Sequence, residues 1–190
     1  MENLKNVELI ETNEPYNKIL YWFFSFPDSN IGLNELCKDV KISKSNANKI
    51  VNRLEKEGFL IKEVVGKAWR IKCNKKHIYN KTKKLAFNLQ LIYDSNIIEK
   101  IHQKFPGFEA IILFGSYRKG DDIDKSDLDI AVSIIGKKQL KIKEFGVIEK
   151  FGYRKNVMVN LHTFSNGKID KRLFFSIVNG IVLDGFLEVK

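Results

Sequence analysis

The sequence predicts an α+β protein in two parts, and three observations support this prediction. The first half holds three segments with helical apolar periodicity, followed by two β-like runs that meet at a glycine. The second half alternates short β-like strands with helical segments. Between the halves, a segment without Gly or Pro predicts a rigid connecting helix. The expected domains are therefore residues 1–74 and 96–190, joined by a connecting helix over residues 75–95.

The first half is expected to contain three helices, over residues 15–26, 32–40 and 43–57. Pro27 closes the first helix, Ser43 is suited to cap the third, and Gly58 is suited to end it. Apolar residues at i, i+3, i+4 and i+7 predict one buried stripe along the third helix, formed by Ala47, Ile50, Val51 and Leu54. Residues 59–65 and 68–73 then predict a hairpin that turns at Gly66-Lys67.

Three helices followed by a two-stranded hairpin resemble a winged helix-turn-helix domain. This resemblance implies that the third helix enters the DNA major groove and that the hairpin contacts the flanking backbone. The implied DNA-binding residues are Lys44, Asn46, Lys49, Asn52, Arg53, Lys67 and Arg70. Lysines would contact phosphates, and Asn46 or Asn52 could read adenine edges. RNA binding remains an alternative, as does a dimerisation or protein-docking role in which the charge serves solubility.

The second half is expected to form a small mixed sheet with helices on one side. The expected strands are residues 109–114, 128–135 and 157–164. The expected helices are residues 97–105, 138–151 and 171–178, with Phe145, Ile148 and Phe151 of the second facing inward. An apolar tail follows over residues 181–189.

The most informative motif lies between the first two of these strands. Gly115-Ser116 follows an apolar run, and after ten further residues comes Asp127-Leu128-Asp129. Carboxylates at i and i+2 of a strand share one face, and they repel each other unless a hard divalent cation lies between them. Gly115 lets the backbone approach a ligand, and Ser116 with the following amides can bind phosphate oxygens. Together these features favour nucleotidyl transfer from a magnesium-bound nucleoside triphosphate.

This motif resembles the signature of the polymerase β-type nucleotidyltransferase superfamily, in the minimal form common in archaea and bacteria. The resemblance covers residues 96–190 and implies that Asp127 and Asp129 are catalytic and ligate Mg²⁺, or alternatively Mn²⁺. The implied nucleotide-binding residues are Gly115, Ser116, Arg118, Lys119 and Ser126. For Lys119 a plain surface role is equally open. Without the resemblance, the motif could be an acidic surface loop beside an ordinary turn.

One position departs from the family pattern. Catalytic members usually carry a third acidic residue on a later strand, and the strand expected here has Asn160 at the corresponding position. An amide can coordinate Mg²⁺ through its carbonyl oxygen, but it brings no charge and cannot accept the proton of an attacking hydroxyl. His162 lies on the same face and could act as ligand or base, or simply line a polar cleft.

Composition narrows the class of protein. The net charge is +10 and the pI is near 9.5, which suits a polyanionic partner. Residues 62–84 contain nine Lys or Arg against one acid, Glu63. The hydrophobic content of 44% and the lack of a long apolar run predict no membrane segment and no signal peptide. Two distant cysteines, Cys37 and Cys73, predict free thiols in a cytoplasmic protein.

The function expected from these patterns is transfer of a nucleoside monophosphate from an NTP, with ATP as the first candidate, to an acceptor hydroxyl. The acceptor could be a protein, a nucleic acid or a small molecule. A DNA-binding regulator whose second domain senses nucleotide is the first alternative. Minimal nucleotidyltransferases also resemble antitoxins that modify or mask a partner toxin, which is the second. The connecting helix could contribute to a homodimer interface.

Overall fold

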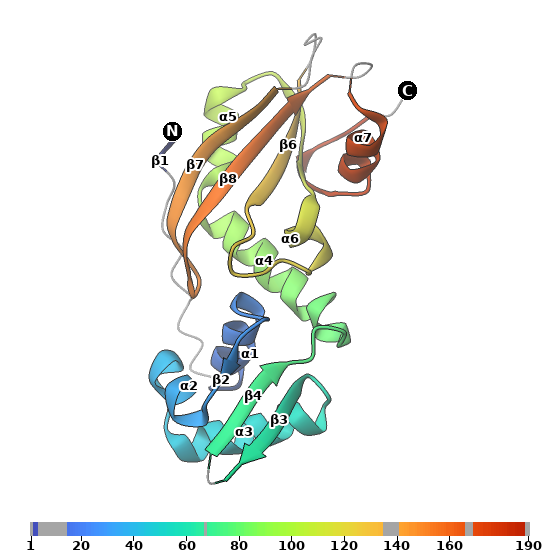
Figure 1. Cartoon of the computed structure of the whole chain (residues 1–190). Coiled ribbons are helices and arrows are strands. Elements are labelled where there is room, and N and C mark those ends of the chain that lie inside the picture. Colours follow the sequence, from blue (N-terminus) through green and yellow to red (C-terminus); the bar gives the residue numbers. More distant parts are fainter. Residues whose placement is uncertain (1, 4–14, 67, 135–140, 166–168, 189–190) are drawn as a thin grey trace.

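The computed structural model describes residues 2–3, 15–66, 68–134, 141–165 and 169–188. The molecule is elongated, with a helical part at one end and a sheet-based part at the other, and helix α4 lies between them (Figure 1). We call residues 15–74 the N-terminal unit. Within the described ranges, no helix has both the length and the apolar character needed to cross a membrane.

The N-terminal unit has the helices and the hairpin that the sequence predicts. Its helices are α1 (Pro15–Ser25), α2 (Leu33–Val40) and α3 (Lys44–Lys56). Ser43 caps α3, because its hydroxyl accepts a hydrogen bond from the Asn46 amide. The hairpin strands are β3 (Leu60–Val65) and β4 (Ala68–Cys73), and a short strand that the sequence did not indicate, β2 (Asn30–Ile31), pairs with the other side of β4.

The second part is built on a six-stranded mixed sheet with strand order β1-β7-β8-β6-β5-β9. Its strands are β1 (Glu2–Asn3), β5 (Phe108–Leu113), β6 (Leu128–Ile134), β7 (Lys141–Phe151), β8 (Arg154–Phe164) and β9 (Ile181–Gly185). The central pair, β6 and β8, is parallel, and β5 and β7 flank it in antiparallel orientation. Strand β1, from the beginning of the chain, pairs in parallel with β7.

One predicted element of this part is wrong. The helix expected over residues 138–151 is strand β7, and residues 138–140 lie outside the described residues. Phe145, Ile148 and Phe151 are buried as expected, but their helix-like spacing arises in a strand whose register shifts between Glu144 and Gly146. The expected apolar tail contains β9, which pairs with β5 at the edge of the sheet.

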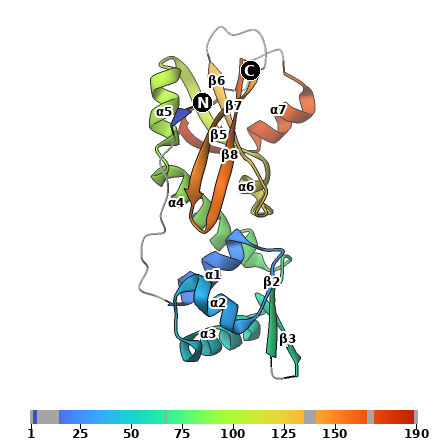
Figure 2. The ribbon, with the colours of Figure 1, turned by 60° about the vertical axis from the view of Figure 1, so that its left-hand side comes forward.

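Helices cover both faces of the sheet, and not one face as expected. Helix α5 (Ile97–Lys104) belongs to the main core, whereas α7 (Lys171–Val178) packs with Ala110, Ile112 and Phe164 in a separate cluster. Figures 1 and 2 show α5 and α7 on opposite sides of the strands. The connector is also shorter than predicted, because α4 spans Lys83–Asp94 and is preceded by a 3₁₀ turn, Ile78–Asn80.

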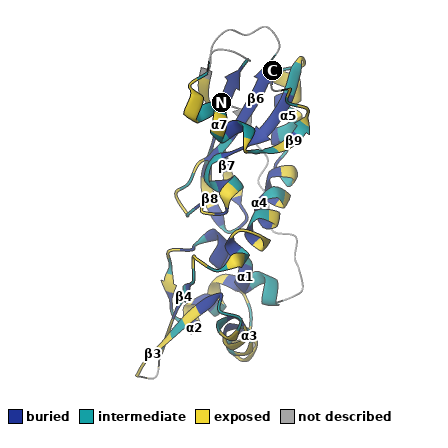
Figure 3. Cartoon of the chain, turned by 90° about the vertical axis from the view of Figure 1, so that its right-hand side faces the viewer, coloured by how far each residue is buried: buried dark blue, intermediate teal, exposed yellow. Residues whose placement is uncertain are grey.

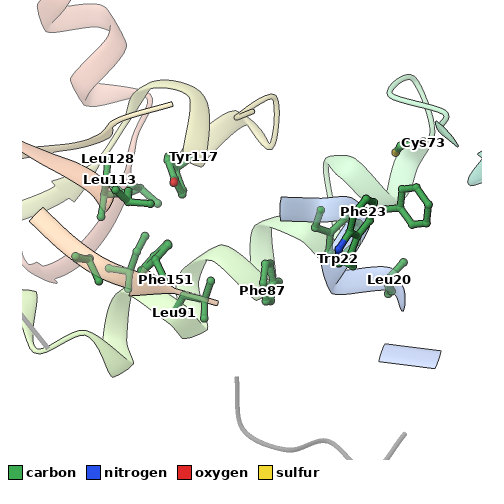
Figure 4. Close-up of a cluster of buried hydrophobic side chains, with 14 of the residues drawn as sticks. Leu20, Trp22, Phe23, Cys73, Phe87, Leu91, Leu113, Tyr117, Leu128 and Phe151 are labelled. Atoms are coloured by element: carbon green, nitrogen blue, oxygen red, sulfur yellow. The ribbon is translucent and has the colours of Figure 1, made fainter. Parts of the chain in front are cut away.

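The main core runs without interruption from one part to the other. A single cluster of buried residues includes side chains from α1, α3, α4, β5, β6 and β8. Figure 4 shows Phe87 of α4 near the aromatic residues of α1, and Leu91 of the same helix near Phe151 of β7. The ring of Phe87 stacks on Tyr21 at a centroid distance of 4.5 Å. Buried residues accordingly follow α4 through the middle of the molecule (Figure 3).

Candidate nucleotide and metal site

The backbone turn after β5 brings Gly115 against the carboxylate of Asp129. Gly115 has φ of +73°, and a Cβ placed on it would lie 2.7 Å from Oδ2 of Asp129. A side chain at this position would therefore collide with the carboxylate and strain the backbone. The Phe114 amide donates to the Asp129 carbonyl across 3.2 Å, which fixes the turn to β6. Short helix α6 (Gly115–Lys119) begins directly afterwards, with Ser116 partly exposed.

The second carboxylate and the amide lie beside Asp129. Asp127 is exposed immediately before β6, and Asp129 is partly buried within it. Because β6 and β8 are parallel and in register, Asn160 is the direct neighbour of Asp129. The Nδ2 of Asn160 lies 3.4 Å from Oδ2 of Asp127. The three side chains that the sequence placed in the catalytic set are therefore adjacent in space.

His162 completes this group on β8. Its Nε2 lies 3.3 Å from Oδ1 of Asp129, and its ring packs edge-on against Phe114 at 4.8 Å between centroids. The residue is only 8% exposed, and its Nδ1 is buried without a hydrogen-bond partner among the described residues. The imidazole thus holds one oxygen of Asp129, while the other oxygen faces Gly115.

The chemistry of these side chains suits a hard divalent cation. Two carboxylates and the carbonyl oxygen of an amide are the oxygen ligands that Mg²⁺ and Mn²⁺ prefer. Within the described residues, no group of three or more His, Cys, Asp or Glu is arranged to hold a metal ion. A cation here would consequently take its remaining ligands from water or from a bound phosphate, as Mg²⁺ often does.

The other predicted nucleotide-binding residues have different surroundings. Ser126 is part of the loop, because its hydroxyl accepts a hydrogen bond from the Ile123 amide across 2.9 Å. Arg118 is partly buried, and its Nε has no hydrogen-bond partner among the described residues. Lys119 is exposed at the far end of α6, where it lines a cleft at the junction with the N-terminal unit.

A buried polar cluster holds α6 in place, and sequence reasoning missed it. We call it the Asp122 cluster, and it consists of Lys84, Asn88, Tyr117, Asp122 and Arg154. Asp122 has no exposed surface, and its carboxylate pairs with both Lys84 and Arg154. Asn88 donates to Asp122 Oδ1 across 2.9 Å and to the Tyr117 carbonyl across 3.2 Å. A single buried carboxylate thus binds side chains from α4 and β8.

Arg154 extends this cluster into the N-terminal unit. Its guanidinium donates to the carbonyls of Phe24 and Ser25 at the end of α1, across 3.1 Å and 2.9 Å, and to the Tyr117 hydroxyl. Burial raises the pKa of Tyr117 to about 12, so this hydroxyl stays neutral. The only sequence signal for the cluster was Asp122 itself, one of four acids within the loop 121–127.

The predicted DNA-binding residues of the N-terminal unit fall into two groups. Lys44, Asn46, Lys49 and Arg70 are exposed, and Lys44 and Lys49 line shallow depressions beside α3. Arg53 is exposed as well, but its guanidinium pairs with Glu57 at 2.9 Å and lies over the ring of Tyr16. Asn52 accepts a hydrogen bond from Lys62 of β3 across 2.6 Å. Lys67 lies outside the described residues.

One comparison with known proteins bears on this site. A family model described as polymerase beta, nucleotidyltransferase, matches residues 96–183, a little under half of the chain. No curated protein matches the chain. The matched range contains the glycine turn, both aspartates, Asn160 and His162. The match supports the superfamily that the Gly-Ser and Asp-x-Asp motifs suggested, because residues 96–183 are similar to the polymerase beta nucleotidyltransferase family model.

Proposed function

We propose that this domain binds a nucleoside triphosphate with Mg²⁺ and transfers the nucleoside monophosphate to an acceptor hydroxyl. The bond between the α- and β-phosphates breaks, pyrophosphate is released, and the hydroxyl loses its proton to solvent. The observation that carries the proposal is the convergence of Asp127, Asp129 and Asn160 beside the backbone turn at Gly115. The family match to residues 96–183 supports the same reaction class. ATP is the first nucleotide to test.

The site residues have separate roles in this proposal. The backbone at Gly115 and the Ser116 hydroxyl would bind the triphosphate, and Arg118 would offset phosphate charge. Asp127 and Asp129 would hold the cation, which neutralises charge that develops on the phosphate oxygens. His162 would keep the Asp129 carboxylate in position, as residues that hydrogen-bond to metal ligands commonly do. Asn160 would supply a ligand oxygen without a charge.

The N-terminal unit supports a second part of the proposal, which is binding of duplex DNA by a winged helix. Three helices, a hairpin and a short third strand have the order of such a domain, and Lys44, Asn46 and Lys49 are exposed on the third helix. Asn52 and Arg53 already bind neighbouring side chains. The contacts to DNA are therefore assigned first to Lys44, Asn46, Lys49 and Arg70.

A nucleotide-sensing regulator is the second candidate function. Asn160 favours it, because a neutral amide next to Asp127 would allow metal and nucleotide to bind while weakening the activation of an acceptor hydroxyl. In that case the domain would report nucleotide levels to the DNA-binding unit without turnover.

Titration calorimetry with ATP and GTP, with and without Mg²⁺, tests the nucleotide site before the acceptor is known. Wild type should bind in the presence of Mg²⁺, and Asp129→Ala should not. Asp121→Ala is a matched control, since it removes an exposed carboxylate from the same loop. Absence of metal-dependent binding by folded wild-type protein would refute both candidate functions.

A further inference from the structure

The junction between the two parts of the molecule contains a cleft that the nucleotide site does not use. Its volume is about 170 Å³, and its walls come from the end of α1, the segment before α4, and the end of α6. Gly120 packs so closely here that a Cβ on it would lie 1.8 Å from the Asn80 carbonyl. The cleft is therefore a fixed part of the junction, at the opposite end of α6 from Gly115.

The charge of the cleft is unbalanced. Its lining includes Lys75, Lys81, Lys84 and Lys119, but only two carboxylates, Asp121 and Asp122. Lys75 is paired with Asp28. Lys81 and Lys119 are exposed, and neither forms an ion pair within the part of the chain that the structure describes.

The wall behind the cleft adds a buried positive charge. Lys84 is 1% exposed and Arg154 is 4% exposed, and they share the single carboxylate of Asp122. Burial lowers the pKa of the Lys84 ammonium, and the nearby Arg154 acts in the same direction, while Asp122 opposes them. Two buried cations with one carboxylate are stabilised when an anion approaches from the cleft side.

We propose that this junction cleft binds a phosphate group. Lysine ammonium groups are common phosphate ligands that act as point charges, and the volume is enough for one phosphate with a few waters, at about 30 Å³ for each water. The group could belong to a small phosphorylated molecule or to the backbone of a nucleic acid. The site is separate from the proposed nucleotide site, because it needs neither Asp127 nor Asp129.

The test uses the full chain labelled with ¹⁵N, in EDTA, titrated with inorganic phosphate and then pyrophosphate. Saturable shifts are expected at the amides of Lys81, Gly120 and Asp121. Lys81→Gln and Lys119→Gln should each weaken binding by about threefold, and the double variant by about tenfold. Lys38→Gln, which removes an exposed lysine from α2, should leave the affinity unchanged.

Two further variants separate this site from the nucleotide site. Ser116→Ala and Asp129→Asn should retain phosphate binding at the cleft. The proposal is overturned if wild type shows no saturable shift, if the double lysine variant binds as wild type does, or if Ser116→Ala alone abolishes binding. Failure of ATP binding with intact cleft shifts would refute the nucleotide site and leave this proposal standing.

A last pair of titrations identifies the source of the phosphate. A short DNA strand without terminal phosphates should compete with phosphate for the same amides if the natural ligand is a nucleic-acid backbone. If only strands with a 5′-phosphate compete, the cleft selects a terminal phosphate, as in a small phosphorylated molecule. Either result supports a phosphate site, and competition by neither strand, together with absent phosphate shifts, contradicts it.

Discussion

Arg154 donates a hydrogen bond through Nη1 to the hydroxyl of Tyr117 across 2.7 Å. This contact joins β8, the strand of Asn160, to α6, the helix that begins at Gly115. The same guanidinium binds two carbonyls of α1. One buried side chain therefore links the N-terminal unit, the loop with Asp122 and the helix beside the proposed nucleotide site.

Replacing Arg154 with Met should destabilise the protein strongly. The change leaves the fully buried Asp122 with only Lys84 as a charged partner, and breaking a buried ion pair costs about 3–5 kcal/mol. Urea denaturation measures the loss. Lys155→Met, at an exposed neighbouring position, should change the free energy of unfolding by less than about 0.5 kcal/mol. Equal effects of the two variants would contradict the role assigned to Arg154.

Gly115→Ala should abolish metal-dependent nucleotide binding while the protein remains folded. The new Cβ would push against Asp129 Oδ2, and the left-handed backbone would cost about 1–2 kcal/mol. Calorimetry with Mg-ATP and a thermal melt measure the two effects separately. Gly107→Ala is the control, since a Cβ there meets no atom within 4 Å among the described residues. Unchanged ATP affinity in the Gly115 variant would be inconsistent with the proposed site.

Asn160→Asp should increase nucleotidyl transfer, by at least tenfold if the missing carboxylate limits the reaction. The new carboxylate would adjoin both Asp127 and Asp129, so metal-free protein should also become less stable through repulsion. Label transfer from ATP and melts with and without Mg²⁺ measure these effects. Asn160→Ala serves as the uncharged control. A folded Asp variant that binds ATP with no gain in transfer would show that Asn160 is not the limiting feature.

Lys49→Gln and Arg53→Gln should affect DNA binding differently. Lys49 is exposed on α3, and loss of one phosphate contact should reduce the slope of log K against log salt by about one. Arg53 is held by Glu57 and Tyr16, so its replacement should change the slope less. Affinity for random duplex DNA at four salt concentrations provides the slopes. Identical slopes for wild type and Lys49→Gln would argue against docking through this face.

Cys73 should make the protein less stable at alkaline pH. Burial raises its pKa from 9.0 to about 11 in the folded protein. Below pH 9 the thiol is protonated in both the folded and the unfolded protein, so its titration takes nothing from the free energy of unfolding. Above pH 9 the unfolded chain releases the proton first, and the free energy of unfolding falls by at most about 2–3 kcal/mol up to pH 11.

Urea denaturation between pH 8 and pH 11 measures this fall, in the presence of a reductant. Cys73→Ala should flatten the profile relative to wild type, whereas Cys37→Ala should keep most of it, because Cys37 is only partly buried. Parallel profiles for wild type and Cys73→Ala would refute the assignment to this thiol.

Local sequence patterns predicted most of the fold. The helix-capping residue Ser43 and the helix-ending residue Pro27 predicted where helices begin and end. The alternation of apolar and polar residues around Asn160 predicted strand β8. The pattern failed at β7, because Phe145, Ile148 and Phe151 recur every three residues, as on a helix, although they lie in a strand. Gly146 within that segment, and Gly152 at the following turn, were signals against a helix.

The adjacency of Asp127, Asp129 and Asn160 could be predicted, because the aspartates share a short motif and Asn160 lies on a strand expected in the same sheet. Long-range contacts could not be predicted in this way. Nothing near Arg154 in the sequence indicates that it binds carbonyls of Phe24 and Ser25, about 130 residues earlier. Likewise, the helix pattern did not distinguish Arg53 and Asn52 from Lys49, and only the fold shows that Arg53 pairs with Glu57 and Asn52 with Lys62.

Helix α4 has a consequence for how such a chain can evolve. Phe87 packs against aromatic residues of α1, and Leu91 belongs to the same core near Phe151. A different N-terminal unit could not simply be joined at residue 75, because it would also need an aromatic ring that packs on Phe87 and backbone carbonyls that accept hydrogen bonds from Arg154. The two parts of this chain are thus expected to have changed together, by compensating substitutions across α4, and not by exchange of whole modules.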